Sequence, residues 1–360
     1  MTGTPAATLG GMRQVTLEAF GGVDQLRVED VDTPEPGPGQ VRVRLTSIGL
    51  NHAELMGRRG EYKLSTGDPP LVLGLEGGGV IEALGDGVDA SRVGQRVVLS
   101  PDAPRPASGG LGGTYRSHYV LPADRALPAP DAIPDDQLGA VWLAYLTAYG
   151  CLVWKHPHDL EGKFVAMPAA SSSTALAAAQ IVKHHGGVAV GLTTSAAKVE
   201  KIQSLGPLAP YDHVIVTHDP PQADGTRPMR KWHREMRKLN DGNGMDVFFD
   251  PVASGGYLAT EILCLAQGGT IYVYGLLGEP GVIDVSPLIR KRGQIAGWVN
   301  NEIIEAGENH WRPACDAILR GFSDGHYQQH IDAAWKLDDV QTAHAEMEKA
   351  AHVGKLVMVP

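Results

Sequence analysis

Residues 164–176 read FVAMPAASSSTAL, which predicts a short buried strand that runs directly into an alanine-rich helix. Only small residues occupy the turn, so backbone N–H groups at the helix N-terminus can approach a phosphate closely. The dinucleotide fingerprint G-x-G-x-x-G would place glycines at Ala170, Ser172 and Ala175, and none is present. The turn still offers N–H groups and hydroxyls, and its candidate phosphate-binding residues are Ser172, Ser173 and Thr174. An ordinary strand–helix turn is the alternative interpretation.

The sequence after the next predicted strand indicates which dinucleotide such a turn would bind. That strand covers residues 188–192 and is followed by TTSAAK at residues 193–198. An NAD-binding unit usually carries an acid here to bind the ribose 2′-hydroxyl, but the first acid is Glu200. Hydroxyls and a lysine suit a 2′-phosphate instead, and the candidates are Thr193, Thr194, Ser195 and Lys198. They predict NADP(H), unless the segment is only a polar loop in which Ser195 caps the next helix.

The composition fits a protein of two domains and excludes several classes of partner. A chain of 360 residues with 43% hydrophobic content can bury more than one core. The net charge of −10 argues against nucleic acids and membranes as partners, which leaves a small-molecule substrate. Cys151, Cys264 and Cys315 are too far apart for a C-x-x-C motif, so we expect a cytoplasmic protein without disulfides.

Two segments were candidates for targeting or membrane elements, and neither has the required pattern. Residues 1–12 lack the basic start and the apolar run of a signal peptide, so we expect a flexible tail. The uncharged run 138–154 is at the lower limit of a membrane span and contains Thr147, two glycines and two tyrosines. It predicts a buried helix between two domains.

The order of predicted elements divides the chain into a β part and an α/β part. Residues 40–50 alternate apolar and polar side chains, as in a half-buried strand, and further short strands are expected at 72–84, 93–99 and 115–121. From residue 162 to about residue 300, strands alternate with helices, which indicates a parallel doubly wound sheet. Its later strands are expected at 213–217, 245–250, 270–274 and 294–299. The remaining C-terminal residues are expected to be helical until a final strand at 354–359.

A basic segment interrupts the α/β part between residues 218 and 244. Its apolar residues fall at helical spacing, namely Met229, Trp232, Met236 and Leu239, with Pro228 placed to start the helix and Gly242 to end it. The other faces are cationic, with Arg230, Lys231, Arg234, Arg237 and Lys238. A solvated amphipathic helix explains this pattern, and docking of a phosphate-bearing carrier or coenzyme is the alternative.

Several short motifs follow one another along the chain, and each alone is weak. They are SIGLN at 47–51, RGEY at 59–62, GLEGGGV at 74–80, GTY at 113–115, VLPAD at 120–124, LTAY at 146–149, FDPV at 249–252, GGT at 268–270 and YG at 274–275. In this order and spacing the chain resembles the medium-chain dehydrogenase/reductase superfamily, and within it the zinc-independent quinone oxidoreductase-like branch.

The resemblance implies an α/β fold of two domains. A GroES-like, mostly antiparallel β catalytic domain is expected over residues 13–145, completed by residues 305–360. A doubly wound parallel Rossmann domain that binds NADP is expected over residues 146–304. The resemblance also implies a homodimer, in which strand 294–299 pairs with its own copy and so removes an exposed sheet edge.

The chain departs from the zinc-dependent members of the superfamily at every metal position. Those enzymes place a Cys where this chain has Asn51, a His where it has Leu75, and a third ligand near Leu143. Zinc needs three or four N, S or O ligands, and leucine supplies none, so no metal is expected. Without a Lewis acid to stabilise an alkoxide, simple alcohol oxidation is disfavoured.

The resemblance assigns the remaining site residues. Asn51 and Tyr62 are placed near the nicotinamide, where Tyr62 is expected to donate a hydrogen bond or proton to the substrate oxygen and Asn51 to orient substrate or carboxamide. Both also fit as ordinary turn or packing residues. The further cofactor-binding residues are Thr147, Tyr274, Gly275 and Lys355.

These expectations together predict an NADPH-dependent reductase of quinones, enones or enoyl thioesters. Two alternatives stay open. One is a reductase of another acceptor, such as an imine in a biosynthetic pathway. The other is a non-catalytic dinucleotide-binding or structural protein, which the missing glycines favour.

Overall fold

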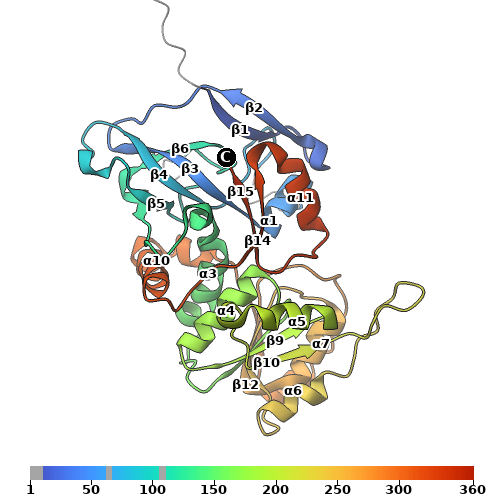
Figure 1. Ribbon diagram of the computed structural model, residues 1–360. Helices are drawn as coiled ribbons and strands as arrows, with labels where there is room; N and C mark the ends of the chain where they lie inside the picture. The colour runs from blue at the N-terminus through green and yellow to red at the C-terminus, as the bar shows by residue number, and fades with distance from the viewer. Residues whose placement is uncertain (1–10, 62–66, 105–110) are drawn as a thin grey trace, which may run out of the picture. The chain divides into compact units, whose positions relative to one another are not determined.

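The computed structural model describes residues 11–61, 67–104 and 111–360. The chain divides into two compact units, one of Met1–Leu143 with Ile331–Pro360 and the other of Ala144–His330. Each unit has its own sheet (Figure 1) and its own hydrophobic core. The predicted fold class is confirmed, since one unit is mostly antiparallel β and the other is a parallel doubly wound α/β sheet.

The first unit is built on a seven-stranded sheet. Its elements are β1 (Met12–Leu17), β2 (Leu26–Val31), β3 (Gln40–Leu50), α1 (His52–Arg59), β4 (Gly77–Leu84), β5 (Arg96–Leu99), β6 (His118–Pro122), β7 (Ala126–Pro128), β14 (Ile331–Lys336), α11 (Val340–Glu348) and β15 (Lys355–Val359). The sheet order is β14-β15-β3-β4-β5-β7, with β6 beside β3, while β1 and β2 form a separate antiparallel pair. Only β14 and β15 are parallel among these neighbours.

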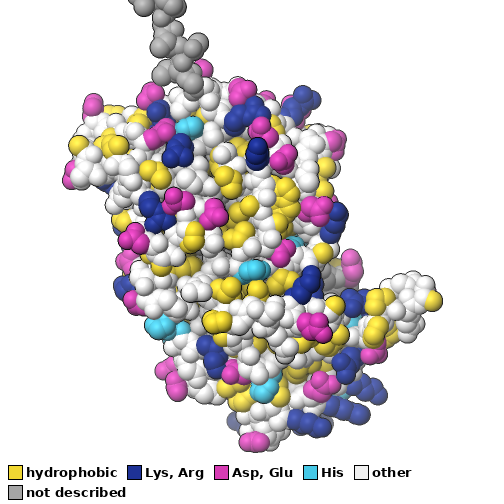
Figure 2. All heavy atoms as spheres, in the orientation of Figure 1, with side chains coloured by type: hydrophobic (Ala, Val, Ile, Leu, Met, Phe, Trp, Pro, Cys, Tyr) yellow, Lys and Arg dark blue, Asp and Glu magenta, His cyan; other side chains and the backbone are white. Residues whose placement is uncertain are grey.

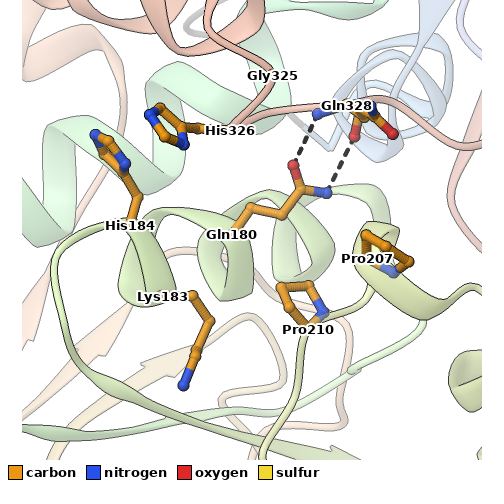
Figure 3. Close-up of a pocket in the computed structure, with 8 residues that line it drawn as sticks. All are labelled: Gln180, Lys183, His184, Pro207, Pro210, Gly325, His326 and Gln328. Carbon is orange, nitrogen blue, oxygen red and sulfur yellow. Dashed lines mark hydrogen bonds between the residues drawn. The ribbon is translucent and has the colours of Figure 1, made fainter.

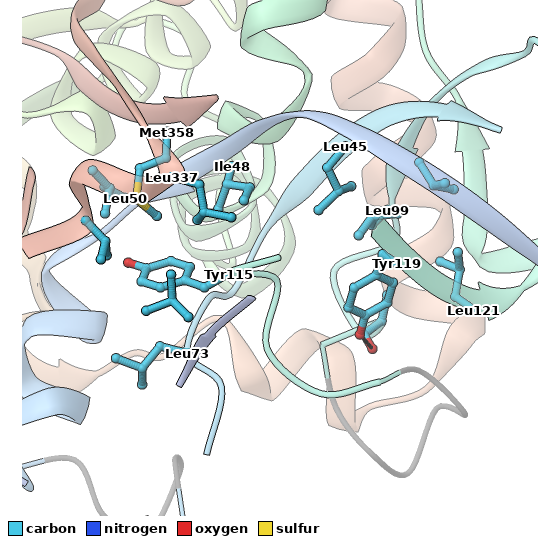
Figure 4. Close-up of a cluster of buried hydrophobic side chains, with 14 of the residues drawn as sticks. Leu45, Ile48, Leu50, Leu73, Leu99, Tyr115, Tyr119, Leu121, Leu337 and Met358 are labelled. Atoms are coloured by element: carbon cyan, nitrogen blue, oxygen red, sulfur yellow. Dashed lines mark hydrogen bonds between the residues drawn. The ribbon is translucent and has the colours of Figure 1, made fainter. Parts of the chain in front are cut away.

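The core of this unit lies under β3, as the alternation in its sequence predicts. Val41, Val43 and Leu45 are buried, whereas the intervening side chains are partly or fully exposed. Two tyrosines fill the space below the strand (Figure 4), and both are fully buried. Their hydroxyls are hydrogen-bonded, as buried hydroxyls need to be: Tyr119 donates to a backbone carbonyl, and Tyr115 lies 3.0 Å from His344 Nε2.

The second unit contains the six-stranded parallel sheet. Its elements are α3 (Trp142–Tyr149, which begins at the boundary), β8 (Phe164–Met167), α4 (Ser173–His184), β9 (Val188–Thr193), α5 (Ala196–Ser204), β10 (His213–Val216), α6 (His233–Leu239), β11 (Met245–Asp250), α7 (Gly255–Cys264), β12 (Leu265–Val273), α8 (Pro287–Lys291), β13 (Gln294–Gly297), α9 (Asn301–Glu305) and α10 (Glu308–Ser323). The strand order is β10-β9-β8-β11-β12-β13, so the direction of winding reverses between β8 and β11. In such sheets, ligands bind outside the carboxyl ends of the strands at this reversal.

Two expectations about secondary structure are wrong. The C-terminal region is not helical throughout, because β14 pairs in parallel with β15. Its sequence, IDAAWK, contains two alanines and has only partly buried alternate side chains, so its strand signal is weak. Helix α6 begins at His233 instead of near Pro228, because Met229 forms a bridge back to His218 and Arg230 N donates to Thr217 O.

Helix α10 follows residue 304, where we expected the nucleotide-binding domain to end. It belongs to the second unit, in which Phe322 and Tyr327 pack on the ring of Tyr145 at 4.8 and 5.2 Å between centroids. At the other end of the chain, β1 begins at Met12, the last residue of the expected tail.

The uncharged run 138–154 is a sequence of short helical pieces. A 3-10 segment (Asp135–Ala140) precedes α3, and a π-helical turn (Gly150–Lys155) follows it. Most of its side chains are buried, including Trp142, Leu146 and Leu152. Over the residues that the structure describes, no helix combines the length and the apolar character that a membrane crossing requires.

Candidate functional site

The turn between β8 and α4 lies at the carboxyl end of the sheet, beside the reversal of strand order. Ser172 is the N-cap of α4, and its Oγ accepts a hydrogen bond of 3.2 Å from Ala175 N. The first N–H groups of a helix have no acceptor within it, so those of Ser173 and Thr174 point beyond the helix end. Ala169 in this turn has a φ of 52°, a left-handed conformation that normally favours glycine.

Tyr274 and Gly275 follow β12 at the same edge of the sheet. The Tyr274 ring stacks on Phe249 at 3.9 Å, and its buried hydroxyl faces Ser172 without reaching hydrogen-bonding geometry. Burial raises the pKa of this hydroxyl well above its ordinary value. Gly275 allows a close approach, because a Cβ there would lie 2.8 Å from Pro251 O. An unsatisfied buried hydroxyl beside the turn fits a ligand that brings a hydrogen-bond partner.

The segment after β9 contains the predicted 2′-phosphate residues, and they differ in exposure. Thr193 is buried, and its Oγ1 accepts from Ser195 N at 3.3 Å. Thr194 is exposed. Ser195 is the N-cap of α5, but its side chain makes no capping hydrogen bond, so capping does not account for this hydroxyl. Lys198 Nζ donates to Ser171 Oγ at 3.1 Å and thereby connects this segment to the β8–α4 turn.

Sequence reasoning missed one contact at this edge. Arg227 Nη2 donates to Thr194 O at 2.9 Å from a segment that we expected to precede a helix. Nothing in the local sequence indicated the contact, because it depends on how the chain returns from β10. Thr147 lies earlier in the chain, in α3, where its carbonyl accepts from Trp298 Nε1 at 2.8 Å.

In the first unit, Asn51 and Lys355 belong to one buried polar network. Lys355 Nζ lies 2.5 Å from Glu76 Oε1 and also donates to Asn51 Oδ1, and the lysine side chain is only 1% exposed. Asn51 Nδ2 donates to Glu76 Oε1 at 3.1 Å, and Leu143 N donates to Glu76 Oε2 at 3.0 Å. The structure therefore brings together two residues to which the resemblance gave different roles. Tyr62 lies outside the described residues.

Glu54 is the second carboxyl group of this network. Its Oε1 accepts from Asn51 Nδ2 at 3.3 Å and from Leu75 N at 3.1 Å, while its Oε2 is buried without a partner among the described residues. Burial raises the pKa of Glu54 to about 7, although nearby Lys355 opposes the shift. One ammonium thus faces two carboxyl groups, and burial favours the protonated form of the second, Glu54.

The three positions of the zinc ligands do not fit zinc in this chain. Leu75 and Leu143 contribute only backbone N–H donors, which bind carboxylates and not metals. Asn51 directs its amide into the network, and the Lys355 ammonium lies against Glu76. A cation is therefore already present beside this glutamate. Within the described part of the chain, no group of three or more His, Cys, Asp or Glu side chains is arranged to bind a metal ion.

Comparisons with known proteins agree with this architecture. A family model described as "Alcohol dehydrogenase GroES-like domain" matches residues 37–131, and one described as "Zinc-binding dehydrogenase" matches residues 174–320. The second description names zinc, whereas the residues of this chain at the zinc positions do not fit the ion.

Similar proteins cover nearly the whole chain. The human synaptic vesicle membrane protein VAT-1 homolog is 26% identical over 97% of this chain and 86% of its own length. The 2-haloacrylate reductase of a Burkholderia species is 27% identical over 94% of this chain and 96% of its own. The quinone oxidoreductase of Pseudomonas aeruginosa is 26% identical over 97% and 99%.

Solved structures share the fold. An NAD-dependent alcohol dehydrogenase superposes with a TM-score of 0.78 at 27% identity, covering 97% of this chain and 99% of that one. Escherichia coli quinone oxidoreductase, solved in complex with NADPH, gives 0.79 at 21% identity over 97% and 100%. With both family models matched in order and the fold shared over the whole length, the chain belongs to the medium-chain dehydrogenase/reductase superfamily.

Proposed function

We propose that the protein is a zinc-independent, NADPH-dependent oxidoreductase that transfers hydride to a quinone or to a conjugated C=C acceptor. The observation that carries the proposal is the 3.1 Å contact between Lys198 Nζ and Ser171 Oγ. It joins the segment after β9 to the β8–α4 turn, so donors for a 2′-phosphate and for a pyrophosphate lie at one edge of the sheet. The NADPH complex of the E. coli quinone oxidoreductase supports the same cofactor here.

The chain's own residues would bind and orient the cofactor, which supplies the hydride when bound. The N–H groups of Ser173 and Thr174 are suited to pyrophosphate oxygens, since the helix end also carries partial positive charge. Thr194, Ser195 and Lys198 would surround the 2′-phosphate. Buried Thr193 would instead fix the shape of this segment. Thr147, Tyr274 and Gly275 remain proposed cofactor residues, whereas Lys355 would act through its network.

The choice of acceptor follows from the residues at the zinc positions. Without a Lewis acid, charge on the acceptor oxygen must be stabilised by hydrogen-bond donors. Hydride addition to a quinone or to a C=C conjugated with a carbonyl moves charge onto that oxygen, where one well-placed donor is effective. Tyr62 is the donor we propose, from the resemblance alone, and Asn51 would position substrate or carboxamide. Two relatives are named for a quinone and a haloacrylate, which are acceptors of this kind.

Cofactor titration followed by an acceptor panel tests the proposal. We expect tighter binding of NADPH than of NADH by fluorescence titration, and oxidation of NADPH by quinones or enones but not by simple aldehydes. Dialysis against a strong chelator should leave binding and turnover unchanged. Equal affinity for the two cofactors would refute the NADPH preference. Stoichiometric NADPH binding without turnover of any acceptor would favour a non-catalytic dinucleotide-binding protein.

We also propose a homodimer formed through β13. This strand is the last in its sheet, and its outer edge has no partner strand among the described residues. The segment that leads into it exposes apolar side chains, with Leu276 66%, Val282 99% and Ile289 82% exposed. Pairing of two copies would cover both the edge and these side chains. A monomeric mass by light scattering at micromolar concentration would contradict this proposal.

A further inference from the structure

The chain between β10 and α6 forms a hairpin that projects from the second unit (Figure 1). His218 and Met229 form an antiparallel bridge, and Asp219 N donates to Pro228 O at 2.9 Å. Nearer the tip, Gln222 N donates to Thr226 O at 2.8 Å. We call residues 218–229 the β10–α6 hairpin. Its prolines, Pro220, Pro221 and Pro228, restrict the backbone, so the unfolded segment has less conformational entropy to lose.

The returning limb of this hairpin carries Arg227, whose side chain reaches the end of β9. Its Nη2 donates to Thr194 O at 2.9 Å. A guanidinium has five N–H donors, so this bond fixes the position of the group while most donors remain. Among the described residues Arg227 makes no ion pair, whereas Arg230 lies 3.8 Å from Asp219 and 3.4 Å from Glu235.

The segment after β9 supplies a second cation itself, at Lys198. Lys198, in α5, contacts Ser171, and Arg227 contacts Thr194 from the hairpin. The exposed Thr194 and the uncapped hydroxyl of Ser195 belong to this segment. The segment therefore combines two hydroxyls, of Thr194 and Ser195, with two cations, Lys198 and the Arg227 that contacts it. Residues 193–198 include no acidic side chain. This is the donor set that a phosphate monoester dianion requires.

We propose that Arg227 is a specificity-determining residue, which binds the 2′-phosphate of NADPH together with Lys198 while its bond to Thr194 O is kept. The β10–α6 hairpin is then a cofactor-binding element of this chain. The planar guanidinium offers parallel N–H groups to phosphate oxygens, which a lysine at the same place would not. The inference rests on the proposed NADPH-dependent function and adds to it the residue that distinguishes the two cofactors.

Fragments of the cofactor test this inference without any catalytic readout. Binding of 2′,5′-ADP and of 5′-ADP is measured by calorimetry on the wild type and on Arg227→Ala, Arg227→Lys and Arg234→Ala. We expect Arg227→Ala to weaken 2′,5′-ADP on the order of 10- to 100-fold and to leave 5′-ADP unchanged, since only the first carries the extra phosphate. Arg227→Lys should recover part of the loss. Arg234, an exposed arginine of α6, is the matched control for net charge, and its removal should leave the ratio of affinities unchanged.

Three other results would contradict the inference, and each has a different consequence for the proposed NADPH dependence or for the role of Arg227. If the wild type prefers 2′,5′-ADP and Arg227→Ala retains that preference, Arg227 is not the specificity residue, while the proposed NADPH dependence stands. If Arg227→Ala weakens both fragments equally, the arginine only fixes the hairpin through Thr194. If the wild type itself does not distinguish the fragments, the NADPH preference and the role of Arg227 are both refuted.

Discussion

The two units contain similar polar residues, which differ in burial and in how many of their hydrogen bonds are made within the protein. In the first, Asn51, Glu54, Glu76 and Lys355 are buried, and their hydrogen bonds go to one another or to backbone groups. In the second, the side chain of Thr194 is exposed, and those of Ser172, Ser173, Ser195 and Lys198 are half-buried. Burial without partners is costly, so the polar atoms of the first group are bonded within the protein, with Glu54 Oε2 as the exception among them. The exposed group can remain partly unsatisfied and is therefore available to a ligand.

The difference also determines how each group responds to its surroundings. Charges in the buried network interact strongly because little water screens them, and loss of one partner leaves the others uncompensated. Charges at the sheet edge are screened by salt and cost little when removed from the apo protein. Mutations in the network should therefore change stability, and mutations at the sheet edge should change ligand affinity.

The largest effect is expected from Lys355→Met. Removal of the ammonium leaves Glu76 and Glu54 buried without a cation, which is expected to lower the free energy of unfolding by about 3–5 kcal/mol. Urea denaturation at neutral pH measures the loss. The additional change Glu76→Gln should recover part of it by removing the uncompensated charge. Lys349→Met is the control, since this exposed lysine pairs with Glu346 alone among the described residues and its loss should cost less than about 1 kcal/mol. Similar losses in the two lysine variants would contradict the contrast.

The contacts within the buried network could not be predicted from the sequence. Asn51 and Lys355 both carried family-based assignments, but their direct contact joins residues that are 304 positions apart. Glu54 and Glu76 gave no separate signal, because charged side chains are usually exposed and a buried pair has no periodic pattern. By contrast, β3 was predicted over its full length, since its alternation reflects burial of one face.

The β10–α6 hairpin was not predicted from the sequence, for a different reason. Pro228 and the spacing from Met229 to Leu239 favoured a helix, and Trp232 and Met236 are indeed buried. The backbone hydrogen bonds donated by Asp219 and Arg230 close a hairpin before α6 begins, and the pattern of side chains does not reveal such bonds. The approach of Arg227 to Thr194 is a consequence of that closure, so it could not be derived from the sequence.

The pH dependence of the free energy of unfolding should report the ionisation of Glu54. Because its pKa is raised to about 7, the folded protein binds more protons than the unfolded chain between about pH 4.5 and 7. Its contribution is therefore largest below pH 4.5 and is lost as the pH rises through 7, by about 1.4 kcal/mol per unit of pKa shift. Glu54→Gln keeps the acceptor for Asn51 and Leu75 and does not titrate, so its stability relative to wild type should increase toward pH 8.

The quantity to measure is the difference in free energy of unfolding between the wild type and Glu54→Gln, by urea denaturation from pH 5 to pH 8. Other buried groups titrate in both proteins and cancel, including Asp250, whose pKa burial raises to about 6, and His344, whose pKa burial lowers to about 3. The groups that face Glu54 are Lys355, Glu76 and Tyr115. Parallel stability curves for the two proteins would show that Glu54 is ionised throughout.

At the sheet edge, Ser172→Asp should affect binding without affecting the fold. Aspartate is as good an N-cap as serine, so α4 should keep its stability. Its negative charge would repel the pyrophosphate, and NADPH affinity should fall on the order of 100-fold, with a smaller loss at high salt. Ser172→Asn is the control, since it caps the helix without charge. Equal NADPH affinities for the Asp and Asn variants, measured by fluorescence titration, would place the pyrophosphate elsewhere.

The smallest effect concerns the backbone of the same turn, at Ala169. Its φ of 52° costs an L-residue roughly 1 kcal/mol, whereas glycine adopts this conformation freely. Glycine also makes the unfolded chain more flexible, so Ala169→Gly should raise the free energy of unfolding by only about 0.5 kcal/mol. Ala170 is the matched neighbour, because it is fully buried and has no positive φ. Ala170→Gly should therefore destabilise by about 1 kcal/mol. Opposite signs in the two variants would show that Ala169 holds a conformation that glycine adopts more readily than alanine. A loss of stability in both would mean that the left-handed conformation carries no measurable cost.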